Sequence, residues 1–92
     1  MPFVYILRCA DGSLYTGAAK DVKRRLAHHL AGRASRYTRA RLPVELVYVR
    51  RLRNWSRALR EEHRVKRLSR PKKLEMIEDA RAPGRFRALA IA

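Results

Sequence analysis

The sequence predicts a single small α+β domain, a three-stranded antiparallel sheet flanked by helices. Two observations lead to this fold class. Three short runs, which begin near residues 3, 13 and 43, are rich in β-branched and aromatic residues and therefore favour strands. The runs that follow the second and third of these place apolar residues at helical spacing. The resulting order, ββαβαα, favours a small sheet with helices packed on it.

The first two strands are expected to form a hairpin. Residues 3–9 contain no breaker and are apolar on both faces, so they predict a buried strand. Asp11-Gly12 supplies the turn, because glycine tolerates the positive φ that a tight reversal requires. Residues 13–18 return as the second strand, which is expected to end near Gly17.

A helix is expected to follow the hairpin. Asp21 is a suitable N-cap, because its carboxylate can accept hydrogen bonds from the unpaired N–H groups of the first turn. Val22, Leu26 and Leu30 recur at helical spacing and predict the buried stripe of this helix. Gly32 is expected to end it.

The next segment leads into the third strand. Residues 33–42 are basic with an interleaved tyrosine, and they predict a loop or a short helix. Pro43 opens a run of alternating residues that predicts the third strand. Val44, Leu46 and Tyr48 are expected to share one face of that strand.

Two further helices are expected after the third strand. Asn54 can cap a long helix that reaches about residue 68. The inner face of this helix is expected to contain Trp55, Leu59 and Val65. Pro71 fits the first turn of the last helix, because proline lacks an N–H that the first turn would leave unpaired. This last helix is expected to dock through Leu74 and Ile77.

Length and charge limit the classes of function. Ninety-two residues allow one domain, expected to span residues 1–80, with residues 81–92 as a loosely attached tail. Lys and Arg number 23 against 8 Asp and Glu, which gives a formal net charge of +15. Such a surface attracts polyanions, so nucleic acid is the first expected partner and an anionic membrane surface the second. The alternative is that the charge only maintains solubility.

Cysteine content and hydropathy favour a cytoplasmic protein. Cys9 is the only cysteine, so an intrachain disulfide is excluded, and its apolar strand predicts a buried, unreactive side chain. No apolar run approaches the ~18 residues that a membrane-spanning helix needs. The N-terminus shows no secretory leader pattern. Because nucleic acid is preferred over a membrane surface as the partner, we expect no membrane association; no small-molecule cofactor is expected either.

Two polar residues border the buried stripe of the first helix. Arg25 and His29 are four residues apart and so lie on one face, beside Val22 and Leu26. This position predicts that they line a cleft between helix and sheet, whereas His28 is expected to face solvent. The alternative is a hydrogen-bonded, half-buried histidine beside an arginine whose charged end reaches water.

A carboxylate is expected on the inner face of the second long helix. Glu62 falls among the apolar residues of that face, whereas Glu61 is expected to turn away from it. A buried carboxylate is costly unless it is paired or bound to a cation. Glu62 could form an ion pair with Lys66 or with Arg25. It could instead hold a divalent ion together with waters and phosphate oxygens, as Mg²⁺ is usually held.

These residues resemble a family signature. Val4-Tyr5-Ile6 and, ten residues later, Tyr15-Thr16-Gly17 are similar to the GIY-YIG motif of the GIY-YIG nuclease superfamily. Arg25 and His29 resemble the arginine and histidine of its first helix, and Glu62 resembles its metal-binding glutamate, with Lys66 one turn further on. The resemblance covers about residues 3–78 and is nearest to the small stand-alone, YhbQ-like branch, including the runs RYTRARLPVELVY and KRLSR.

Besides Thr16 in place of the isoleucine of the motif, the chain departs from the family pattern at three places. Leu30 stands where the family commonly has an asparagine, and Ala18-Ala19 replaces the usual Ile/Val-Thr, which removes a hydroxyl near the site. Val4 replaces the first glycine of the motif, which requires only that the backbone stay extended. None of these changes removes a residue of the implied central chemistry.

The resemblance implies a metal-dependent DNA endonuclease. Glu62 would hold Mg²⁺ or Mn²⁺, which stabilises charge at the scissile phosphate. Tyr5 or Tyr15 would act as the general base, its phenol acidified by nearby cations and the metal. Arg25 would bind phosphate oxygens, and His29 would position the tyrosine or relay its proton.

The remaining expectations concern substrate and partners. Gly17 is expected to allow a close backbone approach, and Tyr37 and Lys66 are expected to orient substrate. Further cations on the helix surfaces suit backbone contacts: Lys23, Arg24, Arg60 and Arg67. The resemblance favours single-stranded or branched DNA as the substrate, cut in DNA repair, recombination or processing. The alternatives are a non-catalytic nucleic-acid-binding module and an adaptor of a repair complex.

Overall fold

The three strands form one antiparallel sheet in the order β2-β1-β3, as predicted. The computed structural model describes residues 1–80, so the expected tail at residues 81–92 lies outside the described residues. The strands are β1 (Phe3–Cys9), β2 (Leu14–Ala19) and β3 (Val44–Arg51). Gly12, at φ +85°, makes the predicted turn between β1 and β2.

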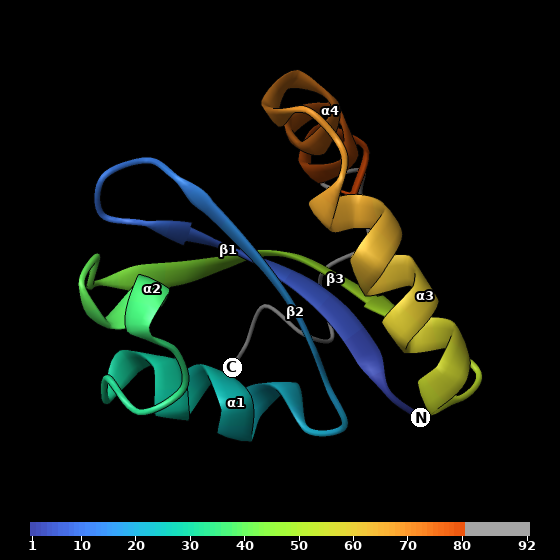
Figure 1. The fold of residues 1–92 in the computed structure, drawn as a ribbon, viewed down its shortest axis with the longest axis horizontal. Helices are drawn as coiled ribbons and strands as arrows, with labels where there is room; N and C mark the ends of the chain where they lie inside the picture. The colour runs from blue at the N-terminus through green and yellow to red at the C-terminus, as the bar shows by residue number, and fades with distance from the viewer. Residues whose placement is uncertain (81–92) are drawn as a thin grey trace.

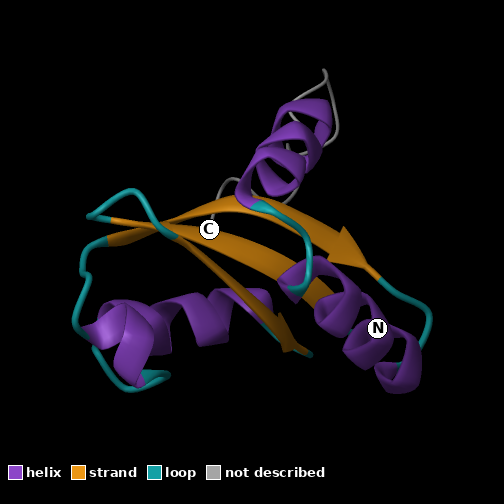
Figure 2. Ribbon diagram, turned by 45° about the horizontal axis from the view of Figure 1, so that its top comes forward, coloured by secondary structure: helices purple, strands orange, loops and turns teal. Residues whose placement is uncertain are grey.

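Four helices within residues 1–80 cover the two faces of this sheet. They are α1 (Val22–Leu30), α2 (Arg36–Arg39), α3 (Trp55–Lys66) and α4 (Arg70–Ala80). Figures 1 and 2 show α1 and α2 on one side of the sheet and α3 and α4 on the other. We call these sides the α1 face and the α3–α4 face. Among the described residues, no helix combines the length and the apolar composition that crossing a membrane requires.

The predicted caps are confirmed. The carboxylate of Asp21 accepts a hydrogen bond from the N–H of Arg24 at 3.0 Å. The Asn54 side chain accepts one from the N–H of Arg57 at 2.9 Å. Gly32, at φ +75°, follows the end of α1. These caps satisfy N–H groups that the first turn of a helix would otherwise leave unpaired, which explains why the sequence located both starts.

Each face of the sheet has its own apolar cluster. The cluster on the α1 face contains Tyr5, Leu7, Cys9, Ala19 and Val44, with Leu26 of α1 packed against it. The cluster on the α3–α4 face contains Ile6, Val47, Tyr48, Val65, Ile77 and Ala80. Cys9 is buried in the first cluster, as expected.

The predicted stripe of α1 was wrong at its last position. Leu30 is 48% exposed, whereas His29 is 1% exposed. At 3.6 residues per turn, a residue seven positions after Val22 lies about 20° from it, and one eight positions after lies about 80° from it. His29 rather than Leu30 therefore continues the line of Val22 into the interior.

The predicted inner faces of α3 and α4 were also wrong in part. Trp55 and Leu59 are 39% and 43% exposed, whereas Ala58 and Val65 are fully buried. Ala58 is small and lets α3 approach the sheet closely, so the larger side chains lie on the flank of the helix. On α4, Ile77 is buried as expected, but Leu74 is not.

An irregularity in β3 changes which residues share a face. Ile6 pairs with Tyr48 and Leu7 pairs with Leu46, so Val47 is an extra residue between two pairs. Such a bulge interrupts the alternation of side chains. Tyr48 therefore joins the cluster on the α3–α4 face, while Leu46 packs on the α1 face, and the expectation that they share a face was wrong.

Candidate active site

The hairpin places the first candidate residue, Tyr5, on the α1 face. Tyr5 on β1 pairs with Gly17 on β2. A Cβ atom at Gly17 would stand 2.6 Å from Cζ of Tyr5, which is closer than real side chains come. The space left by the missing side chain at Gly17 is thus filled by the tyrosine ring. Gly17 lets the phenol lie flat across the neighbouring strand.

The Tyr5 hydroxyl belongs to a buried chain of hydrogen bonds. It lies 2.9 Å from Nε2 of His29, and Nδ1 of the same ring lies 2.8 Å from Oγ1 of Thr38. The Thr38 hydroxyl also lies 3.4 Å from the carbonyl oxygen of Ser35, which is the N-cap residue of α2. Tyr5, His29 and Thr38 are each at most 2% exposed. The structure therefore holds the imidazole between a phenol and a hydroxyl.

This environment keeps His29 neutral at neutral pH. Burial lowers the pKa of His29 to about 4, and the charges of Arg25 and His28 add to this effect. A neutral imidazole has one nitrogen that donates and one that accepts. Because the Thr38 hydroxyl donates to the Ser35 carbonyl oxygen, it accepts from Nδ1, which leaves Nε2 to accept from the Tyr5 hydroxyl. The polar side chain that the sequence placed at a cleft is thus a buried proton acceptor.

The protein groups around Tyr5 do not by themselves acidify its phenol. Burial raises its pKa well above the ordinary value of 10.0, and Tyr15 raises it further. The charge of Arg25 acts in the opposite direction but does not outweigh burial. Desolvation destabilises the phenolate by more free energy than one nearby guanidinium contributes to its stabilisation. Tyr5 therefore keeps its proton unless a partner accepts it.

Aromatic side chains extend the site toward solvent. The ring of Tyr15 meets that of His29 edge-on, with centroids 5.1 Å apart. Tyr37 stacks on Tyr15 at 6.0 Å, and the guanidinium of Arg41 lies 3.9 Å from the Tyr37 ring centroid. Tyr37 is 38% exposed, so this column of rings ends at the surface.

The two glutamates of α3 lie on opposite flanks of its buried line. Relative to Ala58, Glu61 is rotated by about 60° one way and Glu62 by about 40° the other. The Glu61 side chain is 11% exposed and pairs with Arg50 at 3.0 Å and Arg64 at 2.7 Å. These contacts hold the pKa of Glu61 below its usual range, with the Arg64 hydrogen bond the main cause. The expectation that Glu61 turns away from the interior was therefore wrong.

Glu62 lies within electrostatic reach of Tyr5. Its side chain is 20% exposed and pairs with Nζ of Lys66 at 3.3 Å, one of the two ion pairs the sequence suggested. Its charge also contributes to the raised pKa of Tyr5, so the two groups lie within electrostatic reach of each other. Glu62 thus joins α3 to a group of residues that otherwise comes from β1, β2 and α1.

The donor set suits a hard divalent ion held loosely. Within residues 1–80, no three His, Cys, Asp or Glu side chains are grouped as metal ligands. A single carboxylate fits Mg²⁺, which keeps several waters and takes phosphate oxygens from its substrate. Glu62, which is 20% exposed and acts on Tyr5 through its charge, is the candidate ligand. A closed site of the kind that structural zinc occupies would need four protein ligands.

The structure brings the sequence-selected residues into one continuous group. His29 contacts Tyr5 and Tyr15 directly. Arg25 acts on Tyr5 and His29 through its charge, and Glu62 acts on Tyr5 in the same way. The three further candidates are attached to this group: Gly17 beneath Tyr5, Tyr37 on Tyr15, and Lys66 on Glu62.

Thr38 is the member of this group that sequence reasoning missed. It lies in a basic segment in which charge dominates the pattern, and it is fully buried. The signal for it is local. Ser35, three residues earlier, accepts a hydrogen bond from the Thr38 N–H at 3.1 Å and so caps α2. A cap followed by a short turn can direct one side chain inward.

A three-stranded sheet with helices on both faces, two hairpin tyrosines, an arginine on the first helix and a glutamate on α3 are features of one class of nucleases. The family model described as the GIY-YIG catalytic domain matches residues 1–75. The chain belongs to the GIY-YIG family.

Its relatives include small proteins of similar length. A UPF0213 protein of Natronomonas pharaonis is 49% identical over 77 residues, which cover 84% of this chain and 91% of that protein. A UPF0213 protein of Staphylococcus epidermidis is 49% identical over 77 residues, with 84% and 94% covered. The solution NMR structure of a UPF0213 protein from Bacillus halodurans shares 42% identity and a TM-score of 0.59, with 92% of each chain covered. These matches agree with a stand-alone GIY-YIG domain.

Proposed function

We propose that this protein is a divalent-metal-dependent endonuclease that hydrolyses phosphodiester bonds of DNA. The observation that carries the proposal is the hydrogen bond between the Tyr5 hydroxyl and the neutral His29, next to Arg25 and Glu62. A proton acceptor, a cation for phosphate oxygens and a carboxylate for a metal are the three components that hydrolysis of a phosphodiester needs.

Proton transfer is assigned to Tyr5 and His29 together. As water attacks phosphorus, its proton passes to the Tyr5 oxygen while the phenolic proton passes to Nε2 of His29. The bond from phosphorus to the leaving oxygen breaks, and that oxygen takes a proton from solvent. Because His29 accepts the proton, Tyr5 need not exist as a free phenolate, and its raised pKa is no obstacle. Thr38 positions the imidazole by its contact with Nδ1.

Charge at the phosphate is assigned to Arg25 and Glu62. The guanidinium of Arg25 presents several N–H donors that match phosphate oxygens. Glu62 would hold Mg²⁺ or Mn²⁺, which supplies Lewis acidity where negative charge develops. Lys66, paired with Glu62 at 3.3 Å, becomes available to substrate oxygens when a cation replaces it at the carboxylate. Tyr37, exposed and stacked on Tyr15, suits contact with a base.

The preferred substrate is single-stranded or branched DNA, handled in repair, recombination or processing in the cytoplasm. The net charge of +15 supports binding to a phosphate backbone. The exposed Tyr37 ring supports contact with unpaired bases. A single buried cysteine, Cys9, suits a reducing compartment. A partner in a repair complex would supply specificity that one small domain lacks.

The test compares neighbouring glutamates. Purified protein should cut DNA only with Mg²⁺ or Mn²⁺. Glu62→Gln should lower the cleavage rate about 100- to 1,000-fold, the usual cost of losing one electrostatic stabiliser, and Arg25→Ala should do the same. Glu61→Gln is the matched control: it breaks the ion pairs to Arg50 and Arg64 and should lower stability while cleavage persists.

The outcome also decides between enzyme and binding module. Substrates should include single-stranded, duplex and branched DNA, each with and without EDTA. If DNA binds in EDTA but no metal supports cleavage of any substrate, the protein is a non-catalytic nucleic-acid-binding module. If Glu62→Gln cuts as fast as the parent, the assignment of the metal to Glu62 is wrong.

A further inference from the structure

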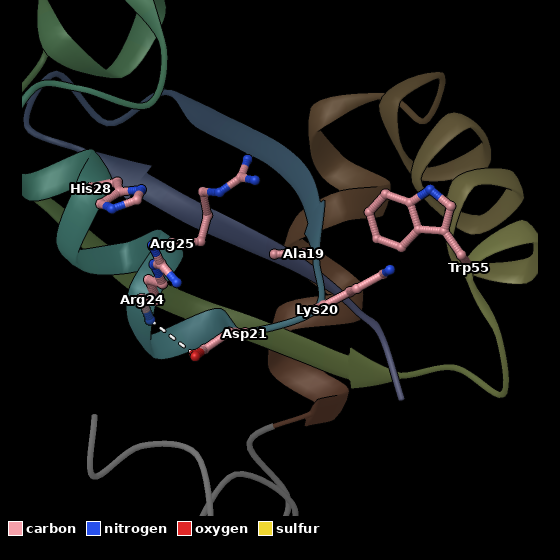
Figure 3. A pocket seen from close by; sticks show the side chains of 7 residues that line it. All are labelled: Ala19, Lys20, Asp21, Arg24, Arg25, His28 and Trp55. Atoms are coloured by element: carbon pink, nitrogen blue, oxygen red, sulfur yellow. Dashed lines mark hydrogen bonds between the residues drawn. The ribbon is translucent and has the colours of Figure 1, made fainter.

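A basic cavity opens beside the candidate site, between the start of α1 and the start of α3. Its volume is about 500 Å³, within the range of ligand-binding sites. Its lining is shown in Figure 3 and consists of Ala19, Lys20, Asp21, Arg24, Arg25, His28 and Trp55. The one carboxylate in this lining, Asp21, accepts the N–H of Arg24 as the cap of α1. The cavity therefore combines three cations with one aromatic ring.

Trp55 is the feature of this cavity that core packing does not explain. It is 39% exposed, while Ala58 and Val65 of the same helix are fully buried and make the contact with the sheet. Nζ of Lys20 lies 5.8 Å from the centre of the indole ring, and Figure 3 shows the two side chains directed toward each other across the cavity. An exposed indole beside cations is the combination on which a nucleobase stacks while its phosphate is neutralised.

The cavity is continuous with the candidate active site. Arg25 lines the cavity and also acts on Tyr5 through its charge. Trp55 precedes Glu62 by seven residues, so the two lie on one flank of α3, about 20° apart and about 10 Å apart along the axis. A strand whose scissile phosphate contacts Arg25 and Glu62 would therefore bring a neighbouring nucleotide to Trp55.

We propose that this cavity, the Trp55 pocket, binds an unpaired nucleotide of single-stranded DNA next to the scissile phosphate. The base stacks on Trp55, and Lys20 and Arg24 contact the adjoining backbone phosphates. In a duplex the faces of each base are covered by its neighbours, so an indole can stack only on an unpaired base. The inference rests on the proposed nuclease function and assigns the path of its substrate strand.

The experiment uses the only tryptophan of the chain as a reporter. The full-length protein is titrated in EDTA with a short oligothymidylate, with the same backbone carrying abasic sites, and with a duplex of equal length. Stacking should quench the Trp55 fluorescence with oligothymidylate, and neither the abasic strand nor the duplex should do so. Because EDTA prevents cleavage, the measurement reports binding alone.

Variants test which side chains contribute. Trp55→Leu should weaken binding of oligothymidylate about 5- to 150-fold, the range that ~1–3 kcal/mol of base stacking represents. Trp55→Phe should have a smaller effect. Leu59→Ala, at an exposed site one turn along α3 and outside the cavity, is the matched control and should bind as the parent does. Lys20→Ala should reduce the slope of log affinity against log salt by about 0.7, which corresponds to one phosphate contact.

The pocket and the nuclease can fail separately. The pocket assignment is overturned if Trp55→Leu binds like the parent, or if the duplex quenches Trp55 as strongly as the single strand. If oligothymidylate quenches Trp55 but the parent protein cuts no DNA with any metal, the nucleotide pocket is supported and the nuclease proposal is wrong. If Trp55→Leu cuts single-stranded DNA at the rate of the parent, the nuclease proposal is supported and the pocket assignment is wrong.

Discussion

The two faces of the sheet bury their side chains to the same extent but use burial differently. On the α3–α4 face, Ile6, Val65 and Ile77 are at most 3% exposed and form an apolar cluster. On the α1 face, Tyr5 and His29 are as deeply buried, but they are joined by hydrogen bonds. Buried polar groups are tolerated when their partners are present. Both faces therefore stabilise the fold, and the α1 face also fixes the positions of protons.

One buried threonine lies on each face of the sheet. Oγ1 of Thr38, on the α1 face, contacts Nδ1 of His29 at 2.8 Å. Thr16 lies on β2 between Tyr15 and Gly17 and so points to the opposite face, where it pairs with Ile6. Within residues 1–80, Oγ1 of Thr16 has no hydrogen-bond partner. The hydroxyl of Thr38 therefore takes part in a chain of hydrogen bonds on the α1 face, whereas the hydroxyl of Thr16 on the α3–α4 face does not.

The largest difference between the faces should be sensitivity to acid. Because the folded-state pKa of His29 is about 4, below its ordinary 6.5, the unfolded chain binds more protons between these pH values. The free energy of unfolding should therefore fall by roughly 3 kcal/mol as the pH is lowered through this window. Urea unfolding at several pH values measures the slope, and His29→Gln should remove this contribution.

The groups around His29 have to be separated in this experiment. Its ring faces Tyr5, Tyr15 and Thr38, and the charges of Arg25 and His28 act on it. The carboxyls of Asp11 and Glu61 also have lowered pKa values, so their stabilising contributions fade as the pH falls further. They remain in His29→Gln and cancel in the difference from the parent. His63→Ala, at an exposed site on α3, should keep the acid sensitivity; an unchanged slope in His29→Gln would show that His29 is not its source.

The next effect should come from the hydroxyl of Thr38. Thr38→Val keeps the shape of the side chain but leaves Nδ1 of His29 without its partner, which should cost ~1–3 kcal/mol of stability. The tautomer of His29, followed by nitrogen NMR, should change, and cleavage should fall with it. Thr38→Ser should restore both.

Thr16→Val is the matched control on the opposite face. It replaces an unpartnered buried hydroxyl with a methyl group, so it should leave stability unchanged or raise it, and cleavage should be unaffected. If Thr16→Val lost as much cleavage activity as Thr38→Val, the hydrogen bond between Thr38 and His29 would not be the reason that Thr38 matters for cleavage.

The smallest effect should come from trimming the apolar face. Ile77→Val removes one buried methylene from the cluster on the α3–α4 face and should cost ~0.5–1.5 kcal/mol. Cleavage at a temperature where the protein stays folded should equal that of the parent. Thermal unfolding and a cleavage assay on the same preparation measure both quantities, and a cleavage defect without unfolding would contradict the division between the faces.

The sequence by itself determined the features that depend on local chemistry. Asp21 and Asn54 were recognisable as caps because their side chains bond to N–H groups only three residues away. The turn at Gly12 follows from a backbone conformation that glycine tolerates. The spacing of Arg25 and His29 needed only the helical repeat. The group that resembles the family signature could therefore be chosen without coordinates.

Only the tertiary structure decided the features that depend on which neighbour a side chain meets. Thr38 became part of the site because α2 packs against α1; the Ser35 cap indicates a helical turn there but not the contact with His29. Glu61 and Glu62 are adjacent in sequence, yet Glu61 pairs with Arg50 and Arg64 while Glu62 pairs with Lys66, because the line from Ala58 to Val65 passes between them. Trp55 stays 39% exposed because the small Ala58 takes the buried position on α3. Packing depends on contacts between segments that are distant in the sequence, whereas capping depends on residues only three positions apart.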